Sequence, residues 1–335
     1  MAKLIVTNGD SAAQNIRDAG VKGRVLEWRD MLHEGPVPAA RSLDLVSDAR
    51  ADYVAATLGF DLGEVRADFA QRDGVLAAHI AYSEVELWFE HDLFDQLQLI
   101  QLLAYFADEP ERLGLRLMQA DTYLGALAPA EIGRFDGTAA AVTAVQLEAG
   151  RAAWEAFTAP TPEQMDRLCA AALPELPYLG AALRRLLCEL PAPGSGLSLI
   201  EERTLRLLEG APRSVAHLFG LISEMEEARF MGDLSFFQRL DTLAAGPEPL
   251  ITGLPFGVAD VHPFTPGQTP GTEEKTYRDY ARAEIRITPA GRAALQGTFD
   301  HAARNGIDRW MGGTHLTPNA LWRYAREEAR LIAPA

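Results

Sequence analysis

A short apolar segment that ends abruptly in ionisable residues constrains the fold of this chain more than any other feature. Residues 85–89 (Val-Glu-Leu-Trp-Phe) have the composition of a buried strand, and Glu90, His91 and Asp92 follow it directly. A strongly apolar helical pattern then begins at Leu93. Open α/β sheets place their ligand sites at the carboxyl ends of strands, just before the following helix. We therefore expect a site at this position.

The same arrangement recurs at other predicted strands. The sequence predicts strands at residues 3–7 and 24–28, and a further strand at 115–119 after the one at 85–89. The polar residues that follow the strands at 3–7, 24–28 and 115–119 are, in chain order, Asn8, Gly9, Asp10, Ser11, Arg29, Asp30, His33, Glu34 and Asp121. Polar groups at successive strand ends indicate a shared crevice, although they name no reaction.

The first ~125 residues alternate between strand and helix, which predicts a Rossmann-like, mostly parallel sheet with right-handed crossovers. Helices are expected at residues 12–19, 43–58, 63–81 and 93–107. Residues 138–190 are alanine-rich and interrupted by prolines, so they are expected to form a helical connector. The fold class is therefore α/β at the amino-terminal end.

The region after the Pro/Gly-rich segment 191–196, which reads as a linker, has a different pattern. It predicts three short helices, an extended segment at 250–253, a long Pro/Gly/Thr-rich loop and a strand within 283–291. This order is similar to a winged helix. The expected organisation is thus an α/β ligand or catalytic domain (1–137), a helical connector (138–190) and a winged-helix-like α+β domain with a terminal anchoring tail (197–335).

Composition excludes several classes of protein. A net charge of −16 weighs against a nucleic-acid binder, because phosphate neutralisation needs a basic surface. No apolar run reaches the roughly 18 residues of a membrane span, and no signal peptide is apparent at the first residues, so we expect a cytoplasmic protein without membrane contact. The two cysteines form neither a metal-binding pattern nor a disulfide framework.

Three strings together resemble a bacterial family known as domain of unknown function 1835. They are Val-Thr-Asn-Gly-Asp-Ser-Ala-Ala from residue 6, Trp-Arg-Asp-Met-Leu-His-Glu-Gly-Pro from residue 28 and Glu-His-Asp-Leu-Phe-Asp-Gln-Leu from residue 90. The tail at residues 308–316, with Trp322 and Arg323, is also similar to the end of many full-length members. The resemblance implies an α/β amino-terminal domain and a bacterial source, and it implies no activity.

The string Asn8-Gly9-Asp10-Ser11 supports more than one interpretation. A glycine turn between a strand and a helix can bind an anion at the helix N-terminus, or Asp10 or Ser11 can simply cap the helix. Gly-Asp-Ser after a first strand also resembles the nucleophile block of SGNH hydrolases. Their late Asp-x-x-His is absent, however, because that spacing occurs here only at Asp30 and His33. A nucleophilic Ser11 is therefore the minor alternative.

If the acidic residues at the strand ends lie close together, the repulsion between their negative charges must be offset. Asp92 has a structural alternative as the cap of the helix that follows, with Asp95 three residues later completing a capping box. Two carboxylates about 4 Å apart repel each other by roughly 4 kcal/mol at an effective dielectric of 20. Such a cluster requires raised pKa values, an arginine such as Arg29, a divalent cation or a cationic substrate group.

Two functions remain open from the sequence. The first is an enzyme that performs hydrolysis or group transfer on a polar, phosphorylated or nucleotide-like small molecule. Its predicted catalytic residues are Asp10, Asp30, His33, Glu90 and His91, and its predicted ligand-binding residues are Asn8, Gly9, Ser11, Arg29, Glu34, Asp92 and Asp121. The second is a ligand-sensing protein whose winged-helix-like domain contacts a protein partner, another copy of the chain or DNA.

Overall fold

The computed structural model describes residues 2–40, 42–109, 114–261 and 275–334. The chain forms two compact units. The first consists of Met1–Arg50, Arg66–Arg184 and Gly312–Thr314, and the second of Ala51–Val65, Arg185–Met311 and His315–Ala335. The helical region after residue 138 thus lies in the first unit up to Arg184.

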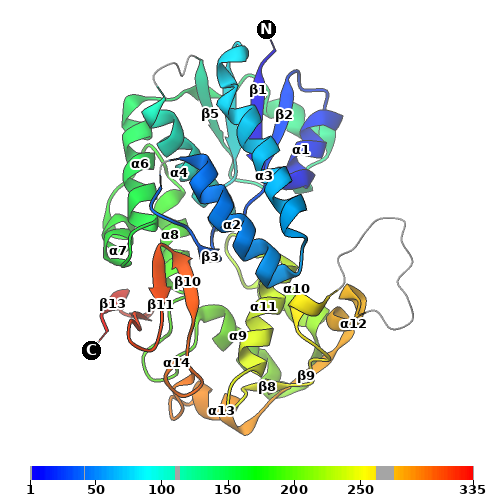
Figure 1. Cartoon of the computed structure of the whole chain (residues 1–335), viewed down its shortest axis with the longest axis vertical. Helices are drawn as coiled ribbons and strands as arrows, with labels where there is room; N and C mark the ends of the chain where they lie inside the picture. Colours follow the sequence, from blue (N-terminus) through cyan, green and yellow to red (C-terminus); the bar gives the residue numbers. More distant parts are fainter. Residues whose placement is uncertain (1, 41, 110–113, 262–274, 335) are drawn as a thin grey trace. The chain divides into compact units, whose positions relative to one another are not determined.

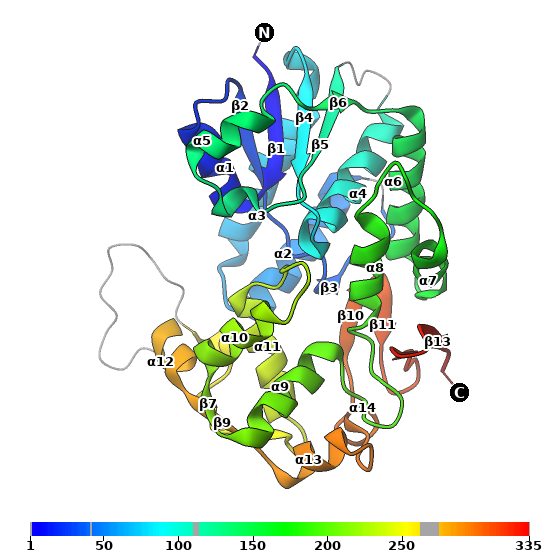
Figure 2. The same cartoon turned by 180° about the vertical axis from the view of Figure 1, so that it is seen from behind.

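The first unit is built on a five-stranded sheet in the order β2-β1-β4-β5-β6, whose strands lie side by side in Figure 2. The strands are β1 (Leu4–Asn8), β2 (Arg24–Trp28), β4 (Val85–Phe89), β5 (Leu115–Gln119) and β6 (Ala140–Ala141). The first four are parallel to one another, and β6 pairs antiparallel with β5. The expected mixed α/β fold with a mostly parallel sheet is confirmed, whereas the edge strand β6 was not predicted.

The strand order creates a switch point in the middle of the sheet. β1 pairs with β2 on one side and with β4 on the other, so the chain leaves β1 in one direction and later returns to build in the opposite direction. The last residue pair between β1 and β4 is Thr7 with Trp88. The crevice beyond the carboxyl ends of strands at such a switch point is where open α/β sheets bind ligands.

Helices cover the sheet and bury its apolar side chains. In both views α1 (Gly9–Asp18) lies beside β2, and α4 (Leu93–Asp108) lies beside α6 (Ala144–Phe157) (Figures 1 and 2). The α4–α6 contact is close because Gly150 has no side chain: a Cβ there would lie 2.3 Å from Leu103 Cβ. The other elements assigned to the first region of the chain are β3 (Gly35–Pro36), α2 (Leu43–Leu58), α3 (Leu62–Ala77), η1 (His79–Ala81), η2 (Leu124–Ala126), α5 (Pro129–Ile132), η3 (Gly133–Phe135), α7 (Glu163–Ala170) and α8 (Leu179–Leu187).

The second unit contains several helices, three of which (α9, α10 and α11) come first along the chain, and a small antiparallel sheet, β7-β9-β8. Its helices and strands are α9 (Leu199–Gly210), β7 (Arg213–Ser214), α10 (Val215–Glu224), α11 (Asp233–Ala244), β8 (Ile251–Thr252), η4 (Val258–Asp260), α12 (Tyr277–Arg282), β9 (Glu284–Ile287), α13 (Pro289–Leu295) and α14 (His301–Arg304), followed by β10 (Arg309–Gly312), β11 (Thr314–Leu316), β12 (Arg323–Ala325) and β13 (Arg330–Ile332). Phe236, Tyr280 and Ile285 are fully buried in its core. The long loop predicted before β9 falls mostly outside the described residues.

The strand predicted within 283–291 is shorter than expected. It ends at Ile287 because Thr288 caps α13: its Oγ1 accepts a hydrogen bond of 3.1 Å from Gly291 N. Pro289, the first residue of that helix, has no N–H to satisfy and its fixed φ suits a helix start. The Thr-Pro dipeptide therefore starts a helix where the sequence analysis continued a strand.

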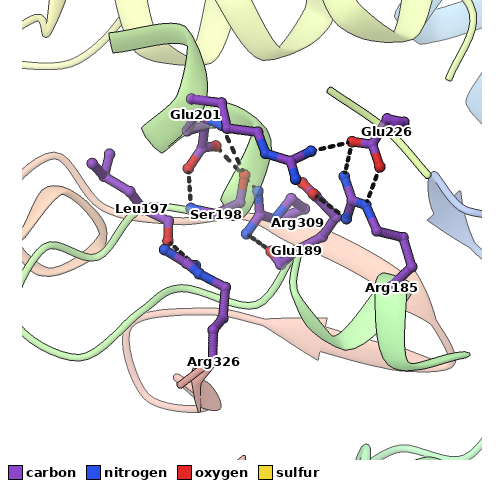
Figure 3. A network of polar contacts seen from close by, with 9 residues as sticks. Arg185, Glu189, Leu197, Ser198, Glu201, Glu226, Arg309 and Arg326 are labelled. Atoms are coloured by element: carbon purple, nitrogen blue, oxygen red, sulfur yellow. Dashed lines mark hydrogen bonds and ion pairs between the residues drawn. The ribbon is translucent and has the colours of Figure 1, made fainter. Parts of the chain in front are cut away.

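Arginines of the tail, Arg309 and Arg326, bond to other parts of the second unit (Figure 3). Arg309 lies 3.2 Å from Glu201 Oε1 and donates to the carbonyl oxygen of Glu189 at 2.7 Å, and Arg326 donates to the carbonyl oxygen of Leu197 at 3.1 Å. Burial opposes ionisation of the Glu189 side chain, but the positive charges around it, Arg185 foremost, lower its pKa to about 2. These contacts hold the tail against residues 189–201 of the same unit.

The segment expected to be a linker is an ordered turn. Ser195 accepts a hydrogen bond of 2.8 Å from His301 N, and Gly196 has a φ of +67°. A Cβ at Gly196 would lie 2.3 Å from Asp300 Oδ1, so glycine is required there by both backbone conformation and space.

Among the described residues, no helix combines the length and the apolar character needed to cross a bilayer.

Candidate functional site

The carboxyl ends of β1 and β4 are joined by a direct side-chain contact. Asn8, the last residue of β1, donates from Nδ2 to Asp95 Oδ2 at 2.6 Å. The other oxygen of Asp95 accepts the backbone N–H of Glu90, the first residue after β4, at 2.7 Å. Asp95 lies in the first turn of α4 and is buried. Its carboxyl group therefore holds the two strand ends together at the switch point.

Glu90 is buried and lies between β4 and the turn after β5. Its Oε1 accepts a hydrogen bond of 2.7 Å from Leu124 N, the first residue of η2. Its carbonyl oxygen accepts from Gln96 Nε2, also at 2.7 Å. Because β5 pairs with β4 and its chain continues into η2, the Glu90 side chain reaches the end of a third strand.

Asp92 caps α4, as its position before an apolar helix predicts. Its Oδ1 accepts from Phe94 N at 2.8 Å and from Asp95 N at 3.2 Å. Asp95 does not complete the predicted capping box, because its carboxylate accepts the N–H of Glu90 rather than that of Asp92. The sequence predicts only a capping role for Asp95, whereas the structure places its side chain beside those of Glu90 and Asp92.

The three carboxyl groups of Glu90, Asp92 and Asp95 form a compact buried group, which we call the acidic cluster. One oxygen of each lies within 4.8 Å of those of the other two. No lysine or arginine in the described ranges forms an ion pair with them. Burial, reinforced by the charge of Asp92, raises the pKa of Glu90 to about 8. Burial raises the pKa of Asp92 to about 6 and that of Asp95 well above its ordinary value.

The cluster can be neutralised by protons or by a cation. Its oxygens have the hard character that Mg²⁺ and Ca²⁺ prefer. Among the described residues, however, both oxygens of Asp95, one of Asp92 and one of Glu90 already accept hydrogen bonds. At most two carboxylate oxygens remain, since the Gly125 backbone also bonds to Glu90, and a buried cation would need several water molecules to complete its coordination. Protons shared among the three groups fit this arrangement better.

The two predicted histidines flank the start of α4. The ring centroid of His33 lies 5.2 Å from that of Phe94, and His33 is buried. His91 is half-buried, with its ring centroid 5.1 Å from that of Tyr123 and 6.0 Å from that of Tyr178. Both rings thus contact aromatic side chains beside the acidic cluster.

The end of β2 is connected to the site through the side chain of Gln98, whereas the Asp30 carboxylate points to a different partner. Gln98 Nε2 lies 3.2 Å from Asn8 Oδ1 and 3.0 Å from the carbonyl oxygen of Asp30. The Asp30 side chain forms a fully buried ion pair with Arg50, with 2.9 Å between Oδ1 and Nε. Arg50 also donates to the carbonyl oxygen of Glu34 at 2.6 Å. These bonds give Asp30, Glu34 and Arg50 a clear role in shaping the turn after β2.

The remaining predicted residues lie at the surface. Asp10 is exposed and its Oδ1 lies 2.5 Å from Arg29 Nη2, so Arg29 is paired there and does not reach the acidic cluster. Ser11 and Asp121 are also exposed. The capping alternative for Asp10 and Ser11 is wrong, because α1 begins at Gly9 and its N-cap is Asn8.

The buried amide residues of α4 were missed by the sequence analysis. Gln96, Gln98 and Gln101 are each at most 3% exposed, and Gln101 Oε1 accepts a hydrogen bond of 2.9 Å from Trp28 Nε1. A signal for them was present: with Asp95, they interrupt a stretch of the helix, residues 93–104, that is otherwise apolar. Polar residues on a helix with no solvent face must bond to something inside the protein.

No family model matches this chain, and no curated protein matches it significantly. The resemblance to domain of unknown function 1835 therefore stays a prediction. A fold of this class hosts many activities, so only the geometry of the site bears on function.

Proposed function

We propose that the protein is an enzyme that binds a polar small molecule beyond the ends of β1 and β4 and performs hydrolysis or group transfer by acid–base chemistry. Glu90 is the proposed general acid and base, and the phosphorylated or nucleotide-like ligand expected from the sequence is its proposed substrate class. The position at the switch point of a mostly parallel sheet supports this assignment.

The observation that carries the proposal is the raised pKa of Glu90, about 8, within a cluster of three buried carboxyl groups. A general acid–base is most effective when its pKa lies near the working pH. Folded proteins normally avoid buried acids without a basic partner, and such groups concentrate at functional sites. If these residues served only to stabilise the fold, apolar side chains of similar volume would do so better than buried carboxyl groups.

Other residues are proposed to bind and orient the ligand. Gly9 has a φ of +64° and is followed by the first turn of α1, whose N–H groups can receive an anionic group. Arg29 follows the neighbouring strand β2, lies at the surface beside Asp10 of α1 and can contribute a positive charge. His33 and His91 are proposed to assist proton transfer from their positions beside the start of α4.

A screen with defined probes tests this proposal. Thermal shift would be measured with ATP, GTP, NAD and sugar phosphates, and turnover with the same compounds and with p-nitrophenyl phosphate. We expect at least one compound to raise the melting temperature and to be turned over, and Glu90→Gln to bind it but turn it over at least about 100-fold more slowly. Equal turnover by Glu90→Gln, or no response to any compound, would contradict the proposal.

A second candidate function is a ligand sensor whose second unit passes the signal to a partner. The order of α9, α10 and α11 with the sheet β7-β9-β8 favours it, since this order is similar to a winged helix. In that family of folds the third helix reads DNA. Here Thr242 is the only exposed residue of α11, so a protein partner or self-association is the proposed output. Ligand binding without turnover in the screen would favour this alternative.

A further inference from the structure

The side chain of Asn15, on α1, is directed at the turn that contacts Glu90. Its Nδ2 lies 3.0 Å from each of three carbonyl oxygens, those of Leu124, Gly125 and Leu127. An amide NH₂ group has only two hydrogens, so two of the three carbonyl oxygens share one hydrogen. Three backbone acceptors around a single side-chain donor fix the course of the chain through η2.

The same turn presents a backbone donor to the acidic cluster. Leu124 N donates to Glu90 Oε1 at 2.7 Å, and the Leu124 side chain is fully buried in the core that includes Ala12, Ala13 and Ile16 of α1. A Cβ at Gly125 would lie 3.0 Å from Ser11 Cβ, so the turn packs closely against α1. The turn has little freedom to move away from α1 while these contacts hold.

We infer that Asn15 is a positioning residue for the Glu90 carboxyl group. Asn15 holds the carbonyl side of the η2 turn, and the N–H side of the same turn contacts Glu90. This inference rests on the function proposed above and adds to it the residue that adjusts how readily Glu90 gives up its proton. An N–H donor favours the ionised form of a carboxyl group, so the turn partly offsets the effect of burial and of Asp92.

Substitution at Asn15 should therefore change Glu90 itself. In Asn15→Ala the turn loses its three carbonyl contacts and is held by packing alone, so the Leu124 N–H is positioned less firmly. The midpoint of Glu90 titration should then rise by roughly half to one pH unit, the value of one ordinary hydrogen bond. The charged groups that face Glu90 are Asp92, the N-cap of α4, and Asp95 in its first turn, and neither is altered by this change.

The experiment is an NMR titration of the full chain with ¹³C-labelled glutamate, in which Glu90→Gln identifies the Glu90 signal. Amide hydrogen exchange at Leu124 is the second measurement. Gln14→Ala is the matched control: Gln14 is the neighbouring residue on α1, and its side chain contacts exposed Asp18 instead of the turn. Asn15→Ser, in which the new side chain is smaller but still polar, provides a second test if the alanine variant does not fold.

The expected result is a higher Glu90 midpoint and faster Leu124 exchange in both Asn15 variants, with wild-type values in Gln14→Ala. Unchanged Glu90 titration in folded Asn15 variants overturns the role of Asn15 and leaves the proposed function intact. A wild-type Glu90 that titrates at its ordinary value overturns the proposed function instead. The two failures are thus distinguished by the wild-type curve.

Discussion

Asn8 at the end of β1 donates a hydrogen bond of 2.6 Å to Asp95 in the first turn of α4, across 87 residues of sequence. This bond joins the two strand ends that flank the switch point of the sheet. It also holds Asp95 beside Glu90 and Asp92, where three carboxyl groups share one buried region. The stability of the fold and the protonation of the site are therefore linked.

Stability should fall as pH rises, because the acidic cluster is neutralised by protons. In the unfolded chain Glu90 and Asp92 release their protons near pH 4. In the folded chain they retain them to about pH 8 and about pH 6, respectively. Between these limits the folded state binds more protons, so the free energy of unfolding decreases with rising pH by an amount on the order of a few kcal/mol.

Glu90→Gln tests this expectation, since glutamine mimics the protonated acid. Melting curves from pH 5 to pH 9 should show a shallower decline for the variant, and a higher melting temperature than the wild type at pH 9. The control is Glu148→Gln, which alters an exposed residue of α6. Parallel curves for Glu90→Gln and the wild type would show that Glu90 ionises normally.

His91→Ala and Leu97→Ala should have opposite effects. His91 is half-buried at the edge of the site, so its loss should weaken ligand binding or turnover with little change in stability. Leu97 is fully buried in α4, and its truncation should cost roughly 2–5 kcal/mol by leaving a cavity. Denaturant unfolding of both variants gives the comparison. If His91→Ala is as destabilising as Leu97→Ala, His91 is a structural residue.

Arg50→Met should destabilise the protein strongly. Asp30 and Arg50 are both fully buried, and removal of the arginine leaves an uncompensated charge at a cost of about 3–5 kcal/mol. Arg29→Met removes the exposed pair with Asp10 and should cost no more than about 1 kcal/mol. Urea denaturation measures both. Similar losses for the two variants would contradict the distinction between the buried and the exposed pair.

Magnesium and calcium should not stabilise the protein appreciably, since protons neutralise the acidic cluster. A cation present at one hundred times its dissociation constant stabilises a folded protein by about 2.7 kcal/mol. Melting temperatures at pH 7 with about 5 mM MgCl₂ or CaCl₂ and with EDTA should agree within error if no such site exists. A rise that disappears in Glu90→Gln would identify the cluster as a cation site.

The second unit should not bind duplex DNA tightly. Seven of the twelve residues of α11 are buried, Arg239 among them, and the chain carries a net charge of −16. A gel shift with about 1 µM protein at low salt should show no complex, because phosphate contacts require a basic surface. A salt-sensitive complex that Arg239→Ala abolishes would refute this prediction.

The sequence by itself determined the local elements near the site. Short apolar runs closed by polar residues or glycine predicted the bounds of β2, β4 and β5 without error. The same local signals predicted that Asp92 caps α4. They failed at Thr288, where a strand was continued into a capped helix, because capping depends on side-chain geometry as well as composition.

Only the tertiary structure decided which polar residues share a site. Asp10 and Asp30 follow strands as Glu90 does, yet each is taken up by an arginine, Arg29 at the surface and Arg50 in the interior. The order of strands brings β1 next to β4, and burial then raises the pKa of Glu90. Strand order and burial arise from contacts between residues far apart in the chain, and no local pattern encodes them.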